Sequence, residues 1–286
     1  MTWAPALALF AAICFGCAAV LLRRALSRAT PLTAAIVSIS FTTVFVWLLA
    51  VTTASLSRLF TWRIVPFLVA GILAPGLARL AYFFGIQRVG AARAVPLVST
   101  SPVFAVILAI AVLGERPAWP LLAGLGCIAV GGALLAGRGH ADAPWRRRDL
   151  ILPLVAALGF AVRDNIFRFG FRQYDEPTLA AAAAALCSLV VMGLVGGSQR
   201  GTGSMRFGGA SLGFLAAAGL AEALAYVSMI RAFRTGDVSV VSPLANTYGM
   251  FTVILAAVFL RDLERVTWRL VVAAALIVAG IFAVMY

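Results

Sequence analysis

Charged and amide side chains occupy three successive positions, Arg163, Asp164 and Asn165, inside the apolar segment LPLVAALGFAVRDNIFRFGF. Two more ionisable residues, Arg79 and Glu222, interrupt other apolar segments. A guanidinium donates hydrogen bonds to carboxylates, and a carboxylate accepts them from cations, so these groups could hold a zwitterion or pair with one another. Successive residues on a helix point about 100° apart, so at least one of the three must contact a neighbouring helix.

The elements that must position these side chains are membrane-spanning helices. The chain has 286 residues, of which 63% are hydrophobic and 12% charged, well outside the usual composition of soluble domains. A spanning helix needs about 20 predominantly apolar residues. The sequence therefore predicts an all-α integral membrane protein with ten transmembrane helices. Their expected positions are 3–22, 32–54, 65–87, 91–113, 118–137, 150–171, 178–196, 210–233, 238–260 and 268–286.

Several other classes of protein are disfavoured by the same composition. All 23 basic residues are Arg, but they are scattered between apolar blocks and form no basic face, so no nucleic-acid partner is expected. Cys14 and Cys17 form a CxxC pair inside an apolar segment, and the single histidine, His140, lies in a connector, so we expect neither a disulfide nor a metal site. No phosphate-binding glycine loop or other enzyme signature is present. We expect no catalytic residues and no cofactor.

An internal repeat divides the chain near its midpoint. Residues 96–113 and 243–260 share nine identities in eighteen positions, including Pro96 with Pro243, and the match resumes at Glu115 with Glu264 and at Gly131 with Gly280. We interpret residues 1–137 and 150–286 as two five-helix repeats joined by a linker at 138–149. Because five is odd, the second repeat enters the membrane from the opposite side, which makes the repeats inverted.

The duplicated pattern resembles a known transporter family. The stretch PVFAVILAIAVLGERPAWPLLAGLGCIAVGGALL, echoed as FTVILAAVFLRDLERVTWRLVVAAALIVAGI, is similar to the paired signature of the drug/metabolite transporter superfamily, in its ten-helix EamA-type branch. Within that branch the chain most resembles bacterial amino-acid exporters of the YddG type. The resemblance implies a central cavity lined by the first, third, fourth, sixth, eighth and ninth helices.

We consider ten residues as candidates for lining that cavity and binding substrate: Arg79, Tyr82, Ser99, Arg163, Asp164, Asn165, Glu222, Tyr226, Asn246 and Tyr248. An arginine would bind the carboxylate of an amino acid, and Glu222 or Asp164 its ammonium group. Glu222 has a competing role as the carrier of a coupling proton. The alternative is purely structural: the four charges would form a salt-bridge cluster, for example Arg79 with Asp164 and Arg163 with Glu222, while the small polar groups would bond their own helices.

Prolines indicate where the helices can bend. Pro75 and Gly76 lie within the expected third helix, Pro96 within the fourth and Pro243 within the ninth. A proline removes one backbone hydrogen bond and exposes carbonyl groups that can bind a solute or act in gating. We treat these four residues as hinge candidates, although kinks that serve only packing are equally common.

The sequence thus predicts a secondary transporter that exports small metabolites by alternating access, with amino acids as the first candidate substrates. Another polar metabolite, such as a nucleotide sugar or sugar phosphate, is the rival substrate class. A lipid flippase or an accessory membrane subunit is the rival of another class. The resemblance implies a bacterial inner membrane with both termini cytoplasmic, whereas charge counting, with fourteen arginines on one set of connectors and seven on the other, favours the opposite orientation. Substrate identity, ion coupling and oligomeric state stay open.

Overall fold

The computed structural model describes residues 3–25, 31–89, 94, 97–135, 146–198, 209–259 and 268–285. Every regular element in these ranges is helical. Six helices are long and apolar enough to cross a membrane, at Ala4–Ala25, Leu32–Thr53, Trp62–Tyr82, Arg148–Gly170, Pro177–Gly196 and Ser211–Thr235. Shorter apolar helices follow at Ser101–Leu113, Trp119–Leu134 and Ala275–Val284. The prediction of an all-α membrane protein is confirmed.

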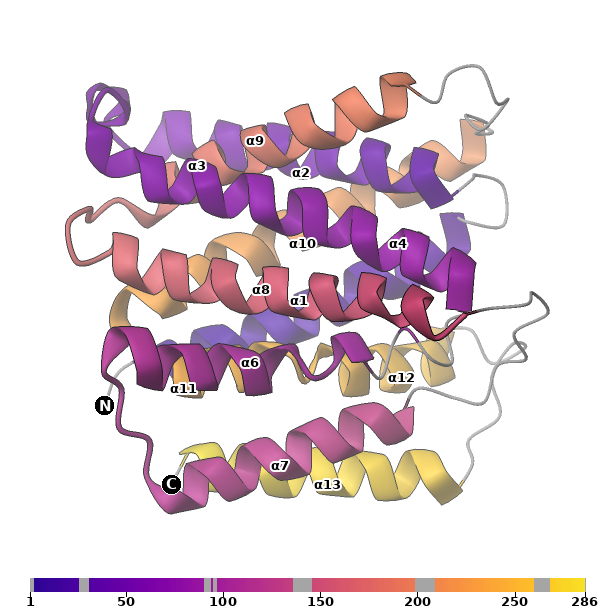
Figure 1. Cartoon of the computed structure of the whole chain (residues 1–286). Helices are drawn as coiled ribbons and strands as arrows, with labels where there is room; N and C mark the ends of the chain where they lie inside the picture. The colour runs from indigo at the N-terminus through magenta and orange to yellow at the C-terminus, as the bar shows by residue number, and fades with distance from the viewer. Residues whose placement is uncertain are drawn as a thin grey trace.

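The helices account for ten passages through the bundle in the part of the chain that the structure describes (Figure 1). In the first half they are α1 (Ala4–Ala25), α2 (Pro31–Thr53), η1 (Leu56–Leu59), η2 (Trp62–Ile64), α3 (Val65–Gly71), η3 (Ile72–Leu77), α4 (Ala78–Val89), α6 (Ser101–Leu108), η4 (Ala109–Leu113) and α7 (Trp119–Leu135). In the second half they are η5 (Arg147–Leu150), α8 (Ile151–Gly170), α9 (Pro177–Ser198), α10 (Gly209–Thr235), α11 (Val238–Ala245), α12 (Tyr248–Phe259) and α13 (Trp268–Met285).

The third passage, formed by α3, η3 and α4, is interrupted near the predicted bend at Pro75 and Gly76. Ala74 has extended torsion angles, with φ −154° and ψ 131°, inside an otherwise helical stretch. Pro75 has no N–H to donate to the preceding turn, so the helix cannot continue regularly through it. On one side of the interruption, α3 and η3 contact both α8 and α9, and on the other side α4 packs on α8. The third passage therefore packs against the second half of the molecule both before and after the interruption, and α4 carries Arg79 there.

The fourth and ninth passages are broken at equivalent places in the two repeats. Thr100 N–H bonds Leu97 O at 3.2 Å, and Thr247 N–H bonds Leu244 O at 3.1 Å. Each threonine hydroxyl donates to the same carbonyl, at 2.6 Å and 2.7 Å respectively. The repeat alignment pairs Thr100 with Thr247, so both copies end one helical segment and begin another at the same position. The same hydrogen bonds therefore recur at equivalent positions in the two repeats.

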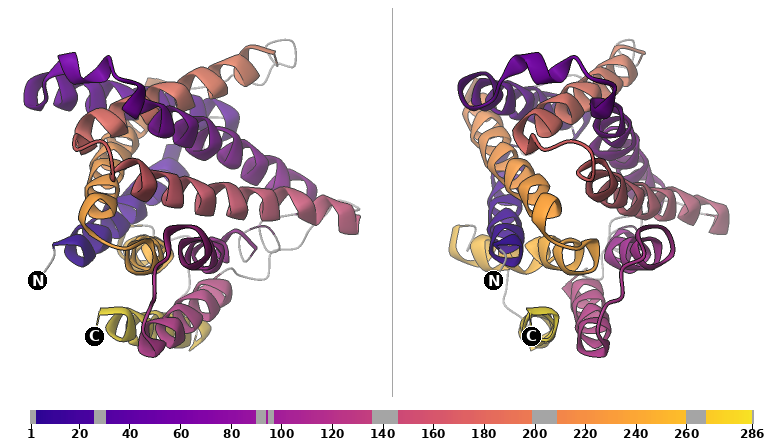
Figure 2. Two further views of the ribbon diagram at one scale, coloured as in Figure 1. Left: turned by 60° about the vertical axis from the view of Figure 1, so that its left-hand side comes forward. Right: turned by 90° about the vertical axis from the view of Figure 1, so that its left-hand side faces the viewer.

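The last helix of each repeat, α7 and α13, packs against the other at one edge of the bundle (Figures 1 and 2). A Cβ added at Gly124 would lie 2.7 Å from Gly280 O, and one added at Gly280 would lie 2.7 Å from Gly124 O. A side chain at either position would force the helices apart, so glycine is what permits this close contact.

The core runs between α8, α9 and α10. Phe67 and Phe167 are fully buried, and their rings lie 6.0 Å apart. Tyr226 of α10 meets Phe167 edge-on at 6.1 Å. At one end of the bundle, which we call the terminal end, α1 begins and α13 ends, so both chain termini lie there (Figure 1).

Candidate functional site

A buried ion pair joins α4 of the first repeat to α10 of the second. Arg79 Nη2 donates a hydrogen bond to Glu222 Oε1 at 2.6 Å. The two side chains are only 16% and 12% exposed. The hydroxyl of Thr42, in α2, lies 3.1 Å from the other oxygen, Glu222 Oε2. Charges at this depth are costly unless they are paired, and here the partners come from helices that are far apart in the chain.

A second ion pair lies within α8. Arg163 donates to Asp164 Oδ1 from Nε at 2.9 Å and from Nη2 at 2.6 Å. Ser242 Oγ, in α11, donates to the other oxygen, Asp164 Oδ2, at 2.7 Å. The Arg163 guanidinium also lies 5.1 Å from the ring centre of Phe160, within range of a cation–π contact. Asp164 is 1% exposed and has a donor on each oxygen, so it is fixed in place.

The pairing offered as an example of the structural alternative, Arg79 with Asp164 and Arg163 with Glu222, is wrong. Each arginine binds the other carboxylate. The expectation rested on the directions in which side chains leave a helix, about 100° apart for neighbours. The long arginine side chain bends back far enough to reach the carboxylate next to it in sequence. Asp164 then contacts α11 with its second oxygen.

Asn165 points in a third direction. Its amide nitrogen donates to Ala105 O in α6 and to Ala161 O in its own helix, each at 3.0 Å. Its side-chain oxygen is buried and has no partner in the part of the chain that the structure describes. The expectation that at least one of the three successive polar residues contacts a neighbouring helix is therefore confirmed, since both Asp164 and Asn165 do.

The three candidate tyrosines lie around the two ion pairs. Tyr248 is 40% exposed, and its hydroxyl lies within electrostatic range of both Arg79 and Arg163. Tyr82 interacts with Tyr248 and Arg79. Tyr226 lies next to Arg163, and its buried hydroxyl has no hydrogen-bond partner among the described residues. The structure thus brings these tyrosines and the four ionisable candidates into one region.

The remaining candidates lie elsewhere or bond their own helices. Ser99 faces Gly132 of α7, where a Cβ added to the glycine would lie 3.7 Å from Ser99 Cβ. Asn246 donates from its amide to Ser242 O at 2.8 Å, as the structural alternative expects. Pro243 lies inside α11, three residues before Asn246, where that helix ends. Pro96 lies outside the described residues. The binding role of Ser99 and Asn246 stays a prediction.

No candidate metal or redox centre is found among the residues that the structure describes. No group of three or more His, Cys, Asp or Glu side chains is placed to hold a metal ion there. The cysteines at positions 14, 17, 127 and 187 are free.

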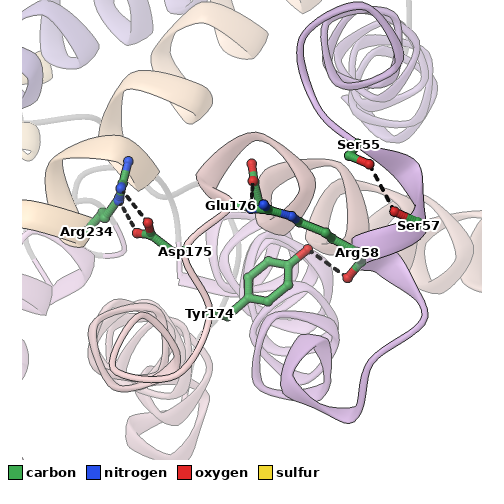
Figure 3. Close-up of polar contacts among 7 residues, drawn as sticks. All are labelled: Ser55, Ser57, Arg58, Tyr174, Asp175, Glu176 and Arg234. Carbon is green, nitrogen blue, oxygen red and sulfur yellow. Dashed lines mark hydrogen bonds and ion pairs between the residues drawn. The ribbon is translucent and has the colours of Figure 1, made fainter.

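The terminal end of the bundle is joined by a separate set of polar contacts (Figure 3). Arg234 at the end of α10 donates to Asp175 from Nε and Nη2, at 2.5 and 2.7 Å. Arg58 pairs with Glu176, and its backbone carbonyl accepts a hydrogen bond from Tyr174 at 3.3 Å. Burial, supported by the charge of Glu176 and opposed by that of Arg58, raises the pKa of Tyr174 to about 12. These contacts join the connector between α8 and α9 to η1 on one side and to the end of α10 on the other.

An open cleft of about 570 Å³ lies at the same end, lined by Leu113, Gly114, Glu115, Arg116, Arg168, Phe171, Arg172 and Asp237. Glu115 accepts hydrogen bonds from the backbone N–H groups of Val238 and Ser239 at 2.8 and 2.9 Å. These are among the first N–H groups of α11, which have no partner within the helix. Gly114 turns the chain toward them with a positive φ of 74°.

Comparison with known proteins agrees with this architecture. The model of the EamA-like transporter family matches residues 2–137 and again residues 148–286. The chain belongs to the EamA-like transporter family. A comparison with curated proteins finds no match. A solved structure, described only as "Crystal structure of protein", superposes on this EamA-like chain with a TM-score of 0.82, over 99% of this chain and 96% of the other, at 18% identity. That likeness concerns the fold alone.

Membership of the EamA-like family makes the chain a multi-pass membrane transporter of small molecules. The Leu-Gly-Glu sequence at the end of the fourth passage contains Glu115. In this EamA-like chain Glu115 caps α11 of the other repeat, so the motif joins the two repeats at the terminal end.

Sequence reasoning missed two partners in the site, Thr42 and Ser242, and also the capping role of Glu115 at the terminal end. Thr42 belongs to the polar pair in SISFTTVF, and Ser242 directly precedes Pro243. Hydroxyl groups in an apolar helix usually bond their own backbone, which is why neither stood out. The signal that would have identified them is depth, since both lie on passages expected to line the cavity or neighbour it.

Proposed function

We propose that this EamA-like transporter exports amino acids, in the manner of the YddG-type exporters, by alternating access around a site between its two repeats. The observation that carries the proposal is the grouping of two buried arginine–carboxylate pairs and three tyrosines at membrane depth. Ionisable groups inside membrane helices are rare, and they usually face a polar pathway.

The Arg79–Glu222 pair supports the alternating-access part of the proposal. It is formed between the third passage of the chain, in the first repeat, and the eighth passage, in the second repeat. Rocking of one repeat against the other changes the distance between these helices. The pair is therefore placed where movement of the repeats alters the charge environment of a bound solute.

The same pairs argue against a nucleotide sugar or sugar phosphate as substrate. A site for a doubly charged phosphate wants arginines without acidic partners, whereas both arginines here are matched by a carboxylate. A flippase would need a groove open to lipid, and an accessory subunit would tolerate neutralising all four interior charges. These alternatives become outcomes of the experiment.

Flux of labelled amino acids into liposomes containing the purified protein tests the proposal, with empty liposomes as the control. The panel includes phenylalanine and threonine. We expect saturable, protein-dependent flux with competition among panel members. Absence of flux for every member contradicts amino-acid transport and favours the phosphate-bearing solutes or lipids, which are tested next in the same liposomes.

We also propose that the protein lies in the bacterial inner membrane with its terminal end in the cytoplasm. The resemblance to the ten-helix branch supports this orientation. A single cysteine at position 286, in a background without the four natural cysteines, reports it through labelling by an impermeant thiol reagent. Labelling from outside intact cells would reverse the orientation.

A further inference from the structure

The two interior arginines have hydrogen-bond donors left over. A guanidinium carries five N–H donors. In the part of the chain that the structure describes, Arg79 uses Nη2 alone, toward Glu222. Arg163 uses Nε and Nη2, both toward Asp164, and leaves Nη1 unpaired.

The unpaired guanidinium nitrogens keep contact with open space. Four buried polar side-chain atoms of the described residues have no partner, and none belongs to an arginine: they are Trp47 Nε1, Ser101 Oγ, Asn165 Oδ1 and Tyr226 Oη. The unpaired nitrogens of Arg79 and Arg163 therefore retain accessible surface. Inside a membrane protein such donors need water or a solute that accepts hydrogen bonds.

The acceptors of the same region are already engaged. Asp164 is 1% exposed, with Arg163 on one oxygen and Ser242 on the other. Glu222 binds Arg79 through Oε1, and its Oε2 lies beside the Thr42 hydroxyl. An incoming ammonium group would have to share a carboxylate oxygen that already accepts a hydrogen bond, whereas an incoming carboxylate would meet unused N–H donors.

The two arginines lie at a similar depth in the bundle. Glu222 and Tyr226 are one turn apart on α10, a spacing of about 5–6 Å between Cβ atoms. Glu222 binds Arg79, and Tyr226 packs edge-on against Phe167, which lies one turn from Arg163 on α8. Tyr248, which is 40% exposed, lies within electrostatic range of both arginines.

We propose that the site recognises its substrate through a carboxylate bound between Arg79 and Arg163 beside Tyr248, and that the α-ammonium group of an amino acid is dispensable for binding. This inference rests on the proposed function and narrows the substrate class to carboxylates, including those without an amino group. The interior carboxylates then serve to hold the arginines in place.

Three solutes with one skeleton test the inference. Phenylalanine carries both charges, 3-phenylpropionate only the carboxylate, and 2-phenylethylamine only the ammonium. Each is added as a competitor of labelled phenylalanine flux in the liposomes. We expect 3-phenylpropionate to inhibit at concentrations within about tenfold of phenylalanine, and 2-phenylethylamine to require at least about tenfold more than the acid, since a charge-assisted bidentate pair is lost. An amine that inhibits as well as the acid overturns the proposal.

Binding measured without transport separates the two ideas. The shift in melting temperature of the detergent-purified protein is recorded with 3-phenylpropionate and with 2-phenylethylamine. A shift with the acid alone, in a protein that transports no amino acid, upholds carboxylate recognition while contradicting amino-acid export. No shift with the acid, in a protein that does transport phenylalanine, contradicts carboxylate recognition while leaving export intact.

A double variant tests the role of Arg163 without leaving an unpaired charge, and Arg163→Lys is its matched control. Arg163→Gln with Asp164→Asn removes both charges of one pair, and it leaves an amide that can accept the Ser242 hydrogen bond. We expect this variant to fold and to lose at least about tenfold in apparent affinity for 3-phenylpropionate. Arg163→Lys, which keeps the charge, should retain part of that affinity. Unchanged affinity in the folded double variant overturns the role of Arg163.

Discussion

The interior of the bundle and its terminal end both contain arginine–carboxylate pairs, but the two sets differ in exposure. In the interior, the carboxylate side chains of Asp164 and Glu222 are 1% and 12% exposed. At the terminal end, those of Asp175, Asp237 and Glu176, which pair with Arg234, Arg168 and Arg58, are 72%, 57% and 23% exposed. The contact distances are nearly the same, at 2.5–2.9 Å in the two interior pairs and in the pairs of Asp175 and Asp237.

Distance therefore says little about what each pair contributes. Water and salt screen an exposed pair, which is worth about 0–1 kcal/mol. Removing one member of a buried pair leaves a charge that nothing compensates, at a cost of about 3–5 kcal/mol. A single terminal pair therefore adds little to stability. Removing one charge of an interior pair is costly, whereas removing both charges together avoids leaving an uncompensated charge.

The largest effect on stability is expected at Asp164. Replacing it with alanine strands the Arg163 guanidinium inside the bundle, so we expect Asp164→Ala to lower the free energy of unfolding by about 3–5 kcal/mol. The measurement is unfolding of the purified protein in a detergent mixture, followed by far-UV circular dichroism. The Arg163→Gln with Asp164→Asn double variant should lose less than Asp164→Ala. A single variant no less stable than the double would show that the interior pair behaves like a surface pair.

Transport should be most sensitive to the pair that joins the repeats. We expect Arg79→Ala and Glu222→Gln each to reduce amino-acid flux at least ~30-fold in protein that still folds, because truncating one partner of a buried pair costs about 2–5 kcal/mol. Flux into liposomes is the measurement, with protein recovery and helical content as checks on folding. Arg58→Gln makes the same kind of change at the terminal end and should leave flux within about twofold. Undiminished flux in both interior variants would refute the site.

The fold was predictable because its signals are local. A block of about 20 apolar residues identifies a spanning helix regardless of what surrounds it. The matching of Thr100 with Thr247 could also be read from aligned letters, and the equivalent helix breaks follow from it.

The pairing of the interior charges could not be read in the same way. Asp164 is adjacent to Arg163 in sequence and Glu222 is 143 residues from Arg79, yet both pairs close at 2.6 Å. The carboxylate that an arginine reaches depends on how each helix is rotated about its axis and on the conformation of the long arginine side chain. Neither of these produces a periodic pattern in the sequence. Glu115 was visible as a motif, but its partner, the first turn of α11, exists only in the folded chain.

A smaller effect is expected where a partly buried terminal-end carboxylate caps a helix. Glu115→Gln removes the charge that caps α11 and leaves an amide that can accept only part of the two N–H bonds. We expect a loss of about 0.5–2 kcal/mol in the free energy of unfolding, the range for a helix cap. Asp175→Asn, at the exposed pair with Arg234, should lose no more than about 1 kcal/mol. If Asp175→Asn lowers the free energy of unfolding more than Glu115→Gln does, the exposure of a carboxylate does not determine how much its contact contributes to stability.

The smallest effect is confined to high pH and belongs to Tyr174, beside the exposed Arg58–Glu176 pair. Its pKa is raised from 10 to about 12, chiefly by burial. Below pH 10 the hydroxyl is protonated in both the folded and the unfolded chain, so its contribution to stability is fully present. Between pH 10 and 12 the unfolded chain loses the proton first, and stability falls. Tyr174→Phe should remove this part of the pH dependence, measured as the difference between the two unfolding profiles. Identical profiles would mean that Tyr174 is as open to water as the ion pair beside it.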